Sequence, residues 1–188
     1  AYSIKNGHLP CPSLINAARD TTNFGLSTDC SAAAVSGVTD YGSGVDTIRI
    51  GGVPVKTLGI SPSLGVDPWT NRFTYTIIKN LGTSKTTYDN YSSNSSYVIR
   101  VNDSAGNMIN STNTATDHKE LVAYTLVSHG QDGRGAYNLE GIQNVACGSV
   151  LDSENCDNDN IFVDTLYNPN ASSAFDDHMR WKALPQVT

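Results

Sequence analysis

The sequence predicts an α+β fold in which the end of a helix packs on an antiparallel sheet with long loops. Three observations support this fold class: a helix stop signal near residue 7, short segments of alternating apolar and polar residues, and long polar connections between those segments. The chain has 188 residues and no internal repeat, so we expect a single domain over residues 1–188.

The helix is expected at the start of the chain. Lys5 is followed by Gly7, and a basic residue before a glycine is typical of a helix C-terminus. Pro10 and Pro12 then prevent the helix from continuing. Because about six residues are too few for a stable isolated helix, we expect Ala1 to lie in the last turns of a truncated long N-terminal helix.

The sheet is expected from five segments. Residues 72–78 alternate between apolar and polar side chains, which predicts a half-buried strand. Residues 120–128 are apolar on both faces and predict a central strand. Residues 96–101 and 158–166 predict further strands, and residues 175–184 fit either a short helix or a last strand.

Charge and motifs exclude several classes of function. With 12 basic and 18 acidic residues the net charge is −6, and without a basic cluster we expect no nucleic-acid partner. No run of about 18 apolar residues predicts a membrane span within this sequence. No nucleophile elbow or phosphate-binding loop occurs, and the glycines after Ser128-His129 fit a tight reversal. The adjacent carboxylates of Asp176 and Asp177 are expected to point apart, so we expect no paired-carboxylate catalytic site there.

Four cysteines are present, at positions 11, 30, 147 and 156. An even number of cysteines in a polar, loop-rich chain predicts disulfides and an oxidising compartment. Zinc is the alternative, but the spacings typical of a zinc site do not occur. Three pairings are open, and we favour the local pairs Cys11–Cys30 and Cys147–Cys156, each worth about 2–3 kcal/mol in the chain-entropy model.

The acidic segment LDSENCDNDN, residues 151–160, is the candidate metal site. Its carboxylates alternate with amide side chains, and oxygen ligands of this kind suit calcium. We therefore predict Asp152, Asp157 and Asp159 as calcium ligands. The alternative is a solvated loop held by the Cys147–Cys156 disulfide.

The segment DPWTNRFTY, residues 67–75, is expected to form a rigid turn that leads into a strand. Pro68 fixes φ, Asp67 can cap the turn, and Asn71 tolerates a left-handed conformation. We predict that these residues and Trp69 form a structural anchor, with the indole of Trp69 buried. The alternative is that Trp69 is a platform for a ligand.

Several segments, taken in chain order, resemble bacterial type IV pilin-like proteins, which include the pseudopilins of type II secretion systems. These segments are YSIKNGHLPCP, VPVKTLGI, DPWTNRFTY, SHGQDGRGA and FDDHMRW. In that family a long N-terminal helix ends at a segment similar to the first of these, and an Asp-Pro-Trp-Gly-Asn segment starts the sheet. Thr70 stands here at the position of that glycine.

The resemblance implies a structural subunit of a type IV pilus or type II secretion pseudopilus, and not an enzyme. Its partners would be other pilin-like subunits, and the absent helix would anchor it in the inner membrane before assembly. The implied location is the bacterial cell envelope or surface, and calcium in the C-terminal loop is known in the major pseudopilins of the family. The alternative function is a secreted adhesin or carbohydrate-binding module that stacks ligands on Trp69, Tyr88 and Tyr91.

Overall fold

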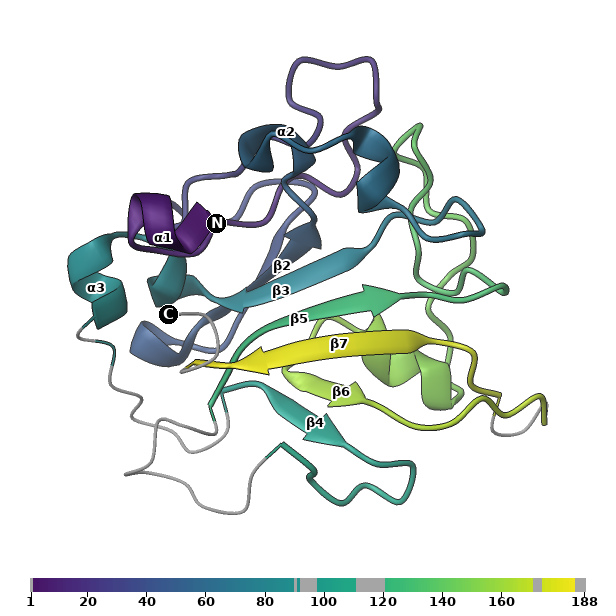
Figure 1. Cartoon of the computed structure of the whole chain (residues 1–188). Coiled ribbons are helices and arrows are strands. Elements are labelled where there is room, and N and C mark those ends of the chain that lie inside the picture. The colour runs from purple at the N-terminus through teal and green to yellow at the C-terminus, as the bar shows by residue number, and fades with distance from the viewer. Residues whose placement is uncertain (1, 90, 92–97, 111–120, 171–173, 185–188) are drawn as a thin grey trace.

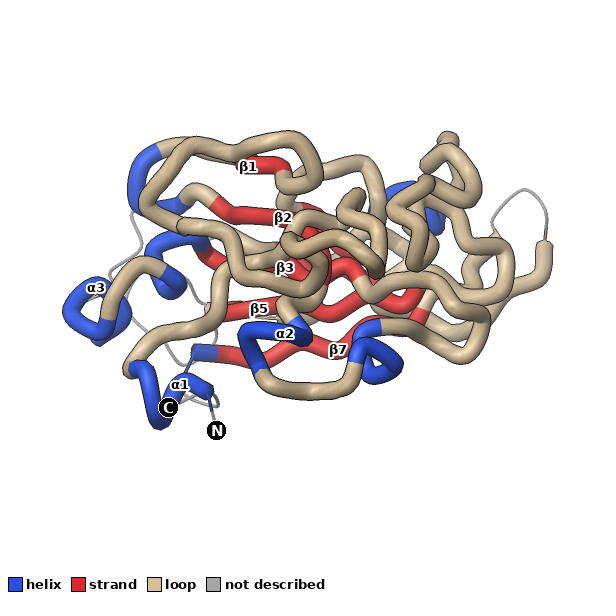
Figure 2. The backbone as a smooth tube through the Cα atoms, turned by 90° about the horizontal axis from the view of Figure 1, so that it is seen from above, coloured by secondary structure: helices blue, strands red, loops and turns tan. Residues whose placement is uncertain are grey.

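The computed structural model describes residues 2–89, 91, 98–110, 121–170 and 174–184, and its centre is a five-stranded antiparallel sheet (Figure 1). The strand order is β1-β2-β3-β5-β7. Figure 2 shows these strands side by side in one layer, with long loops around them. The strands are β1 (Thr39–Tyr41), β2 (Ile48–Gly52), β3 (Thr74–Ile78), β5 (Val122–Ser128) and β7 (His178–Ala183).

The strand predictions are confirmed in their main features. The segments 72–78 and 120–128 contain β3 and β5, which are both interior strands of the sheet. The segment 175–184 contains a strand, β7, at one edge. Every residue of β3 is buried, so this strand is not half-buried as its alternation predicted.

The helices are short, and the expectation of a long helix packed on the sheet is wrong. None of the described α-helices is longer than five residues. The helix α1 ends at Asn6, directly before Gly7. No helix in the described part of the chain has the length and apolar character needed to cross a bilayer. The fold is therefore mostly antiparallel sheet.

The α-helices are α1 (Tyr2–Asn6), α2 (Val55–Leu58) and α3 (Lys85–Asp89). The 3-10 helices are η1 (Gly44–Asp46), η2 (Pro62–Gly65), η3 (Lys79–Gly82) and η5 (Leu151–Asn155).

A second, two-stranded sheet provides further apolar side chains to the core. Its strands, β4 (Arg100–Asn102) and β6 (Ile161–Val163), pair in parallel, whereas the sequence predicted only antiparallel pairing. The core combines side chains from both sheets, among them Ile48, Ile77, Val101, Val127 and Phe162. Shared apolar contacts, rather than a covering helix, thus exclude water from the interior.

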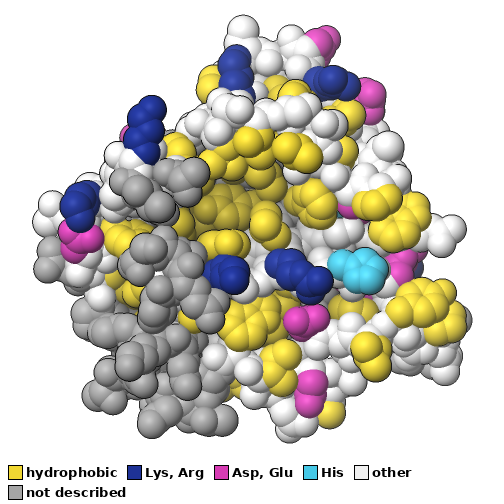
Figure 3. All heavy atoms as spheres, viewed as in Figure 1, with side chains coloured by type: hydrophobic (Ala, Val, Ile, Leu, Met, Phe, Trp, Pro, Cys, Tyr) yellow, Lys and Arg dark blue, Asp and Glu magenta, His cyan; other side chains and the backbone are white. Residues whose placement is uncertain are grey.

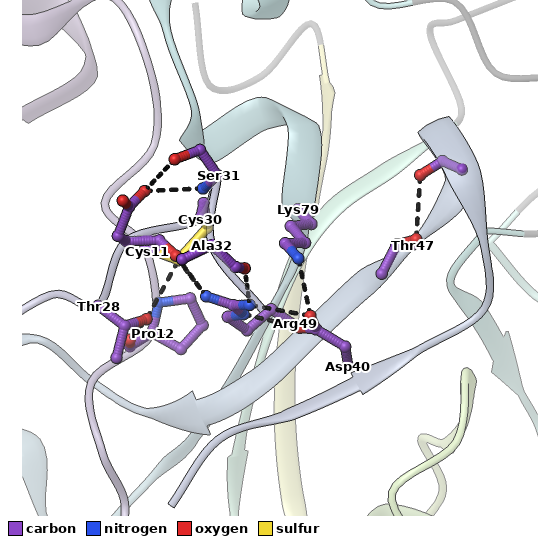
Figure 4. A network of polar contacts seen from close by, with 12 residues as sticks. Cys11, Pro12, Thr28, Cys30, Ser31, Ala32, Asp40, Thr47, Arg49 and Lys79 are labelled. Atoms are coloured by element: carbon purple, nitrogen blue, oxygen red, sulfur yellow. Dashed lines mark hydrogen bonds and ion pairs between the residues drawn. A yellow bond between two sulfur atoms is a disulfide. The ribbon is translucent and has the colours of Figure 1, made fainter. Parts of the chain in front are cut away.

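A buried arginine fixes the N-terminal loops to the sheet (Figure 4). Arg49 on β2 is completely buried and forms an ion pair of 2.7 Å with Asp40 on β1. Its guanidinium also donates to the backbone carbonyls of Asp29 (2.6 Å) and Ala32 (2.7 Å). A buried charge is tolerated only when its donors are satisfied. Arg49 therefore holds in place the loop beside the Cys11–Cys30 disulfide.

One face of the sheet carries exposed cations beside apolar side chains. The register places Tyr124 opposite Lys182 and Leu126 opposite Arg180, so all four side chains lie on the same face. Tyr124 and Leu126 are half-buried, whereas Arg180 and Lys182 are exposed. Figure 3 shows this face, with basic side chains and a histidine in a row beside apolar side chains. We call this surface the basic face and define it by Tyr124, Leu126, His178, Arg180 and Lys182.

Candidate metal centre

Three carboxylates converge at one end of the sheet. Asp132, Asp152 and Asp176 each offer an oxygen atom, and these atoms all lie within 4.8 Å of one another. Asp132 belongs to the turn after β5, Asp152 to η5, and Asp176 to the segment that enters β7. The cluster therefore connects three segments that are far apart in the sequence.

Backbone hydrogen bonds orient these carboxylates. The amide of Asp132 donates to Oδ2 of Asp176 at 3.0 Å, and the amide of Asp176 donates to Oδ1 of Asp152 at 3.2 Å. The other oxygens, Oδ2 of Asp152 and Oδ1 of Asp176, are buried and have no hydrogen-bond partner among the described residues. Only 1% of Asp152 is exposed. A buried carboxylate oxygen that lacks a partner is unfavourable and suits a bound cation.

The electrostatics of the cluster also favour a cation. Burial, and then the carboxylates of Asp132 and Asp176, raise the pKa of Asp152 to about 6. Burial likewise raises the pKa of the neighbouring Asp177 to about 8. Arg134 offsets part of this repulsion through its contact of 3.3 Å with Asp132. A divalent cation would stabilise the ionised carboxylates further.

A glycine permits the close approach of Asp176. Gly130 has φ of 56°, and a Cβ atom at this position would lie 2.4 Å from the carboxyl carbon of Asp176. A side chain would therefore push Asp176 away from the other two carboxylates. The glycines after Ser128-His129 were predicted to serve a tight reversal, and here one of them also makes room for a candidate ligand.

The predicted calcium ligands are not all brought together. Asp152 belongs to the cluster of three carboxylates, whereas Asp157 and Asp159 line a separate cavity of about 200 Å³. Burial, and then Asp159, raise the pKa of Asp157 to about 6. Asp132 and Asp176 were not predicted as ligands, because they lie in other segments of the sequence than Asp152 and no local pattern connects the three. The cavity is also lined by Asn16, Tyr137, Gln143 and Glu154.

The turn before β3 is anchored by its polar side chains and not by its tryptophan. Asp67 and Asn71 are buried, whereas Trp69 is 42% exposed and Pro68 is also exposed. The prediction that the indole of Trp69 is buried is therefore wrong. Oδ1 of Asp67 accepts hydrogen bonds from the amides of Trp69 (3.0 Å) and Asn71 (2.9 Å). It is Thr70, with φ of 70°, and not Asn71 that takes the left-handed conformation.

This turn also supports the candidate metal centre. The side-chain amide of Asn71 donates to the carbonyl of Gly130 at 2.7 Å. The hydroxyl of Ser128 donates a hydrogen bond to Oδ2 of Asp67 at 2.7 Å. Nε2 of His129 and the hydroxyl oxygen of Thr74 are hydrogen-bonded at 2.7 Å. The buried network thus fixes the backbone that places Gly130 against Asp176.

The aromatic surface of the alternative binding module is not formed. Tyr88 and Tyr91 are both buried in the hydrophobic core. Of the three residues that were predicted to stack against a ligand, Trp69 alone is exposed. A carbohydrate-binding surface that needs all three side chains is therefore not present.

Both predicted disulfides are confirmed. Cys11 is bonded to Cys30, and Cys147 is bonded to Cys156. Stable disulfides are typical of proteins outside the reducing cytosol. The chain therefore belongs in an oxidising, extracytoplasmic compartment.

Comparisons of the whole chain were made with protein-family models, with curated proteins and with solved structures. None of the three comparisons gives a match. The candidate metal centre and the basic face are therefore the features on which a function can be argued.

Proposed function

We propose that this chain is a structural subunit of a pilin-like assembly at a bacterial cell surface, and that it binds one calcium ion. The observation that carries the calcium site is the cluster of Asp132, Asp152 and Asp176, in which a buried carboxylate oxygen has no partner among the described residues. An ion at this position would join the turn after β5, η5 and the start of β7. Its role would be to hold these segments together.

Calcium is the ion that suits this set of ligands. Calcium binds oxygen ligands at about 2.3–2.6 Å, so two of its ligands can lie up to about 5 Å apart across the ion. The carboxylate oxygens of the cluster, within 4.8 Å of one another, fit this range. Zinc prefers sites with thiolate or imidazole ligands, and this cluster offers carboxylates alone.

Thermal unfolding with and without calcium tests the metal centre. Chelator-treated protein should gain about 5 °C or more in melting temperature when calcium exceeds its dissociation constant about a hundredfold. Asp152→Asn should abolish this gain. The matched control carries Asp157→Asn and Asp159→Asn, which change the separate cavity and should leave the gain intact. An unchanged melting temperature in the wild type, or loss of the gain in the control, would contradict the proposal.

The assembly part of the proposal rests on the basic face. The chain has a net charge of −6, yet Arg180 and Lys182 lie exposed beside Tyr124 and Leu126 and form no ion pair within the described ranges. An apolar surface beside cations fits a partner that is both apolar and acidic. A neighbouring acidic subunit meets this requirement, and a repeated head-to-tail contact of this kind builds filaments.

Charge reversal tests the assembly contact. Sedimentation velocity at low salt should show association that increases with protein concentration. The variant Arg180→Glu with Lys182→Glu should prevent it. Lys5→Glu with Lys56→Glu makes the same change in net charge at exposed residues outside the basic face and should preserve association. Equal association in both variants, or none in the wild type, would argue against this contact.

A further inference from the structure

The Cys147–Cys156 disulfide closes the loop that carries one of the candidate metal ligands. Asp152 lies on η5 between the two cysteines, which are nine residues apart in sequence. Ser153, its neighbour, donates from its hydroxyl to the carbonyl of Cys147 at 2.8 Å. The conformation of Asp152 therefore depends on a short loop whose two ends are covalently joined.

The same disulfide also supports the turn that carries Asp132. A Cβ atom at Gly135 would lie 2.1 Å from Cβ of Cys156, so the backbone of this turn rests directly on the disulfide. A Cβ atom at Gly148, next to Cys147, would lie 2.8 Å from the guanidinium of Arg134. Two of the three ligand-bearing segments are therefore packed around this one covalent bond.

The two disulfides differ in their access to solvent. Cys11 and Cys30 are 2% and 3% exposed, so the first disulfide is buried. Cys147 and Cys156 are only half-buried. A reductant in solution must reach a sulfur atom to attack it. The second disulfide is therefore the one that a folded molecule offers to a thiol.

We propose that the Cys147–Cys156 disulfide controls cation binding at the cluster of Asp132, Asp152 and Asp176. This inference rests on the metal centre of the proposed function. With the disulfide intact, the loop holds the Asp152 carboxylate beside the other two. With the disulfide reduced, repulsion among the three carboxylates moves Asp152 toward solvent, because the loop no longer opposes it.

The redox step is a thiol–disulfide exchange with a dithiol. One thiolate of the dithiol attacks a sulfur of the disulfide, and the other cysteine leaves as a thiolate and takes up a proton. The second thiol of the dithiol then displaces the first cysteine and closes its own disulfide. Two electrons pass to the protein, which gains two thiols, while the dithiol is oxidised. In the reverse direction, an extracytoplasmic dithiol oxidoreductase in its disulfide form would complete the metal site.

Coupling of this kind is reciprocal. If the disulfide strengthens cation binding by a given factor, a bound cation must favour the disulfide over the two thiols by the same factor. The metal and the disulfide should therefore protect each other, and this gives two independent measurements.

The first measurement is calcium affinity by titration calorimetry on chelator-treated full chain. The oxidised wild type is compared with Cys147→Ser combined with Cys156→Ser, whose folding is checked by circular dichroism. Calcium should bind at least about tenfold more weakly to the variant. If the folded variant binds calcium as tightly as the wild type, the coupling is overturned while the metal centre stands. If the oxidised wild type binds no calcium, the proposed metal centre fails, and this inference fails with it.

The second measurement does not require the reduced form to be folded. Oxidised protein is equilibrated with mixtures of reduced and oxidised dithiothreitol in calcium or in chelator, and free thiols are then alkylated and mapped. Calcium should lower the equilibrium constant for reduction of Cys147–Cys156 at least about tenfold, and Asp152→Asn should remove this shift. Equal equilibrium constants in calcium and in chelator would overturn the inference.

Discussion

The hydroxyl of Ser128 donates a hydrogen bond of 2.7 Å to the carboxylate of Asp67, and this contact joins the turn before β3 to the end of β5. The two residues are neighbours only because β3 and β5 pair in the sheet. Both side chains are buried. The turn is therefore tied to the strand that leads into the candidate metal centre.

Replacement of Asp67 should destabilise the protein strongly. Asp67→Ala removes the acceptor of Ser128 and of the Asn71 amide, and it leaves these buried donors without partners. We expect a loss of about 2–4 kcal/mol in the free energy of unfolding, measured with denaturant. Trp69→Ala is the control and should cost less than about 1 kcal/mol, because that side chain is 42% exposed. Similar losses in both variants would mean that the indole also anchors the turn.

Thr70 is a site for stabilisation. Its φ of 70° is a left-handed conformation that is unfavourable for a β-branched residue. Thr70→Gly should remove this strain and raise the free energy of unfolding by about 0.5–1 kcal/mol, after the entropy that glycine adds to the unfolded chain. Thr70→Ala keeps a Cβ atom and should gain less. A loss of stability in Thr70→Gly would show that the threonine side chain makes a contact that outweighs the strain.

Gly130 and Gly106 separate the effect of crowding from that of backbone conformation. Both have positive φ, but a Cβ atom would collide with Asp176 at Gly130 and would meet nothing within 4 Å at Gly106. Gly106→Ala should therefore lower the free energy of unfolding by about 1 kcal/mol, because alanine is strained at positive φ even where there is room for its Cβ atom. Gly130→Ala should cost at least about 2 kcal/mol and should also abolish the stabilisation by calcium. Denaturant unfolding with and without calcium measures both effects, and full calcium stabilisation in Gly130→Ala would place the ion elsewhere.

His129 should make the stability depend on pH. Burial is the main cause that lowers the pKa of His129 from 6.5 to about 4. The unfolded chain takes up a proton below about pH 6.5 while the folded chain does not, so stability is lost as pH falls from about 6.5 toward 4. Protonation of this histidine in the unfolded chain should by itself lower the free energy of unfolding by about 2 kcal/mol between pH 7 and pH 5.

His129→Gln tests that contribution because it cannot titrate and can still reach Thr74. The raised pKa of Asp177 acts in the opposite direction, since the stability it contributes is lost as pH rises from about 4 toward about 8. Asp177 is present in both proteins, so its effect cancels in the comparison of wild type with variant. Equal pH dependence of unfolding in the two proteins would rule out the contribution of His129.

The parts of the fold that local patterns specify could be predicted from the sequence. Alternation located β3, apolar character on both faces located β5, and the spacing of the cysteines indicated the two disulfides. These signals depend on residues close together in the chain. The long helix was expected from the stop signal before Gly7, and such a signal marks where a helix ends without specifying what covers the sheet.

The candidate site could be predicted only in part. Asp152 stood out because acidic residues crowd its own segment, and the same crowding pointed to Asp157 and Asp159, which line a separate cavity. The pairing of β5 with β7 brings Asp132 close to Asp176, and the amide of Asp176 bonds to Asp152 on η5; no local pattern reveals these contacts. The burial of Arg49 was equally hidden, because arginine is usually exposed and its partners come from other segments.

The parallel pairing of β4 with β6 has a consequence for how the chain folds. The partners of this sheet, such as Val101 and Phe162, are separated by the whole of β5 and by η5 in the sequence. Contacts between such distant residues form only after a large loop has closed, and a high share of them slows folding to milliseconds or longer. During synthesis, β4 would leave the ribosome well before its partner strand exists. Its apolar side chains would then stay exposed to water and to chaperones until β6 arrives.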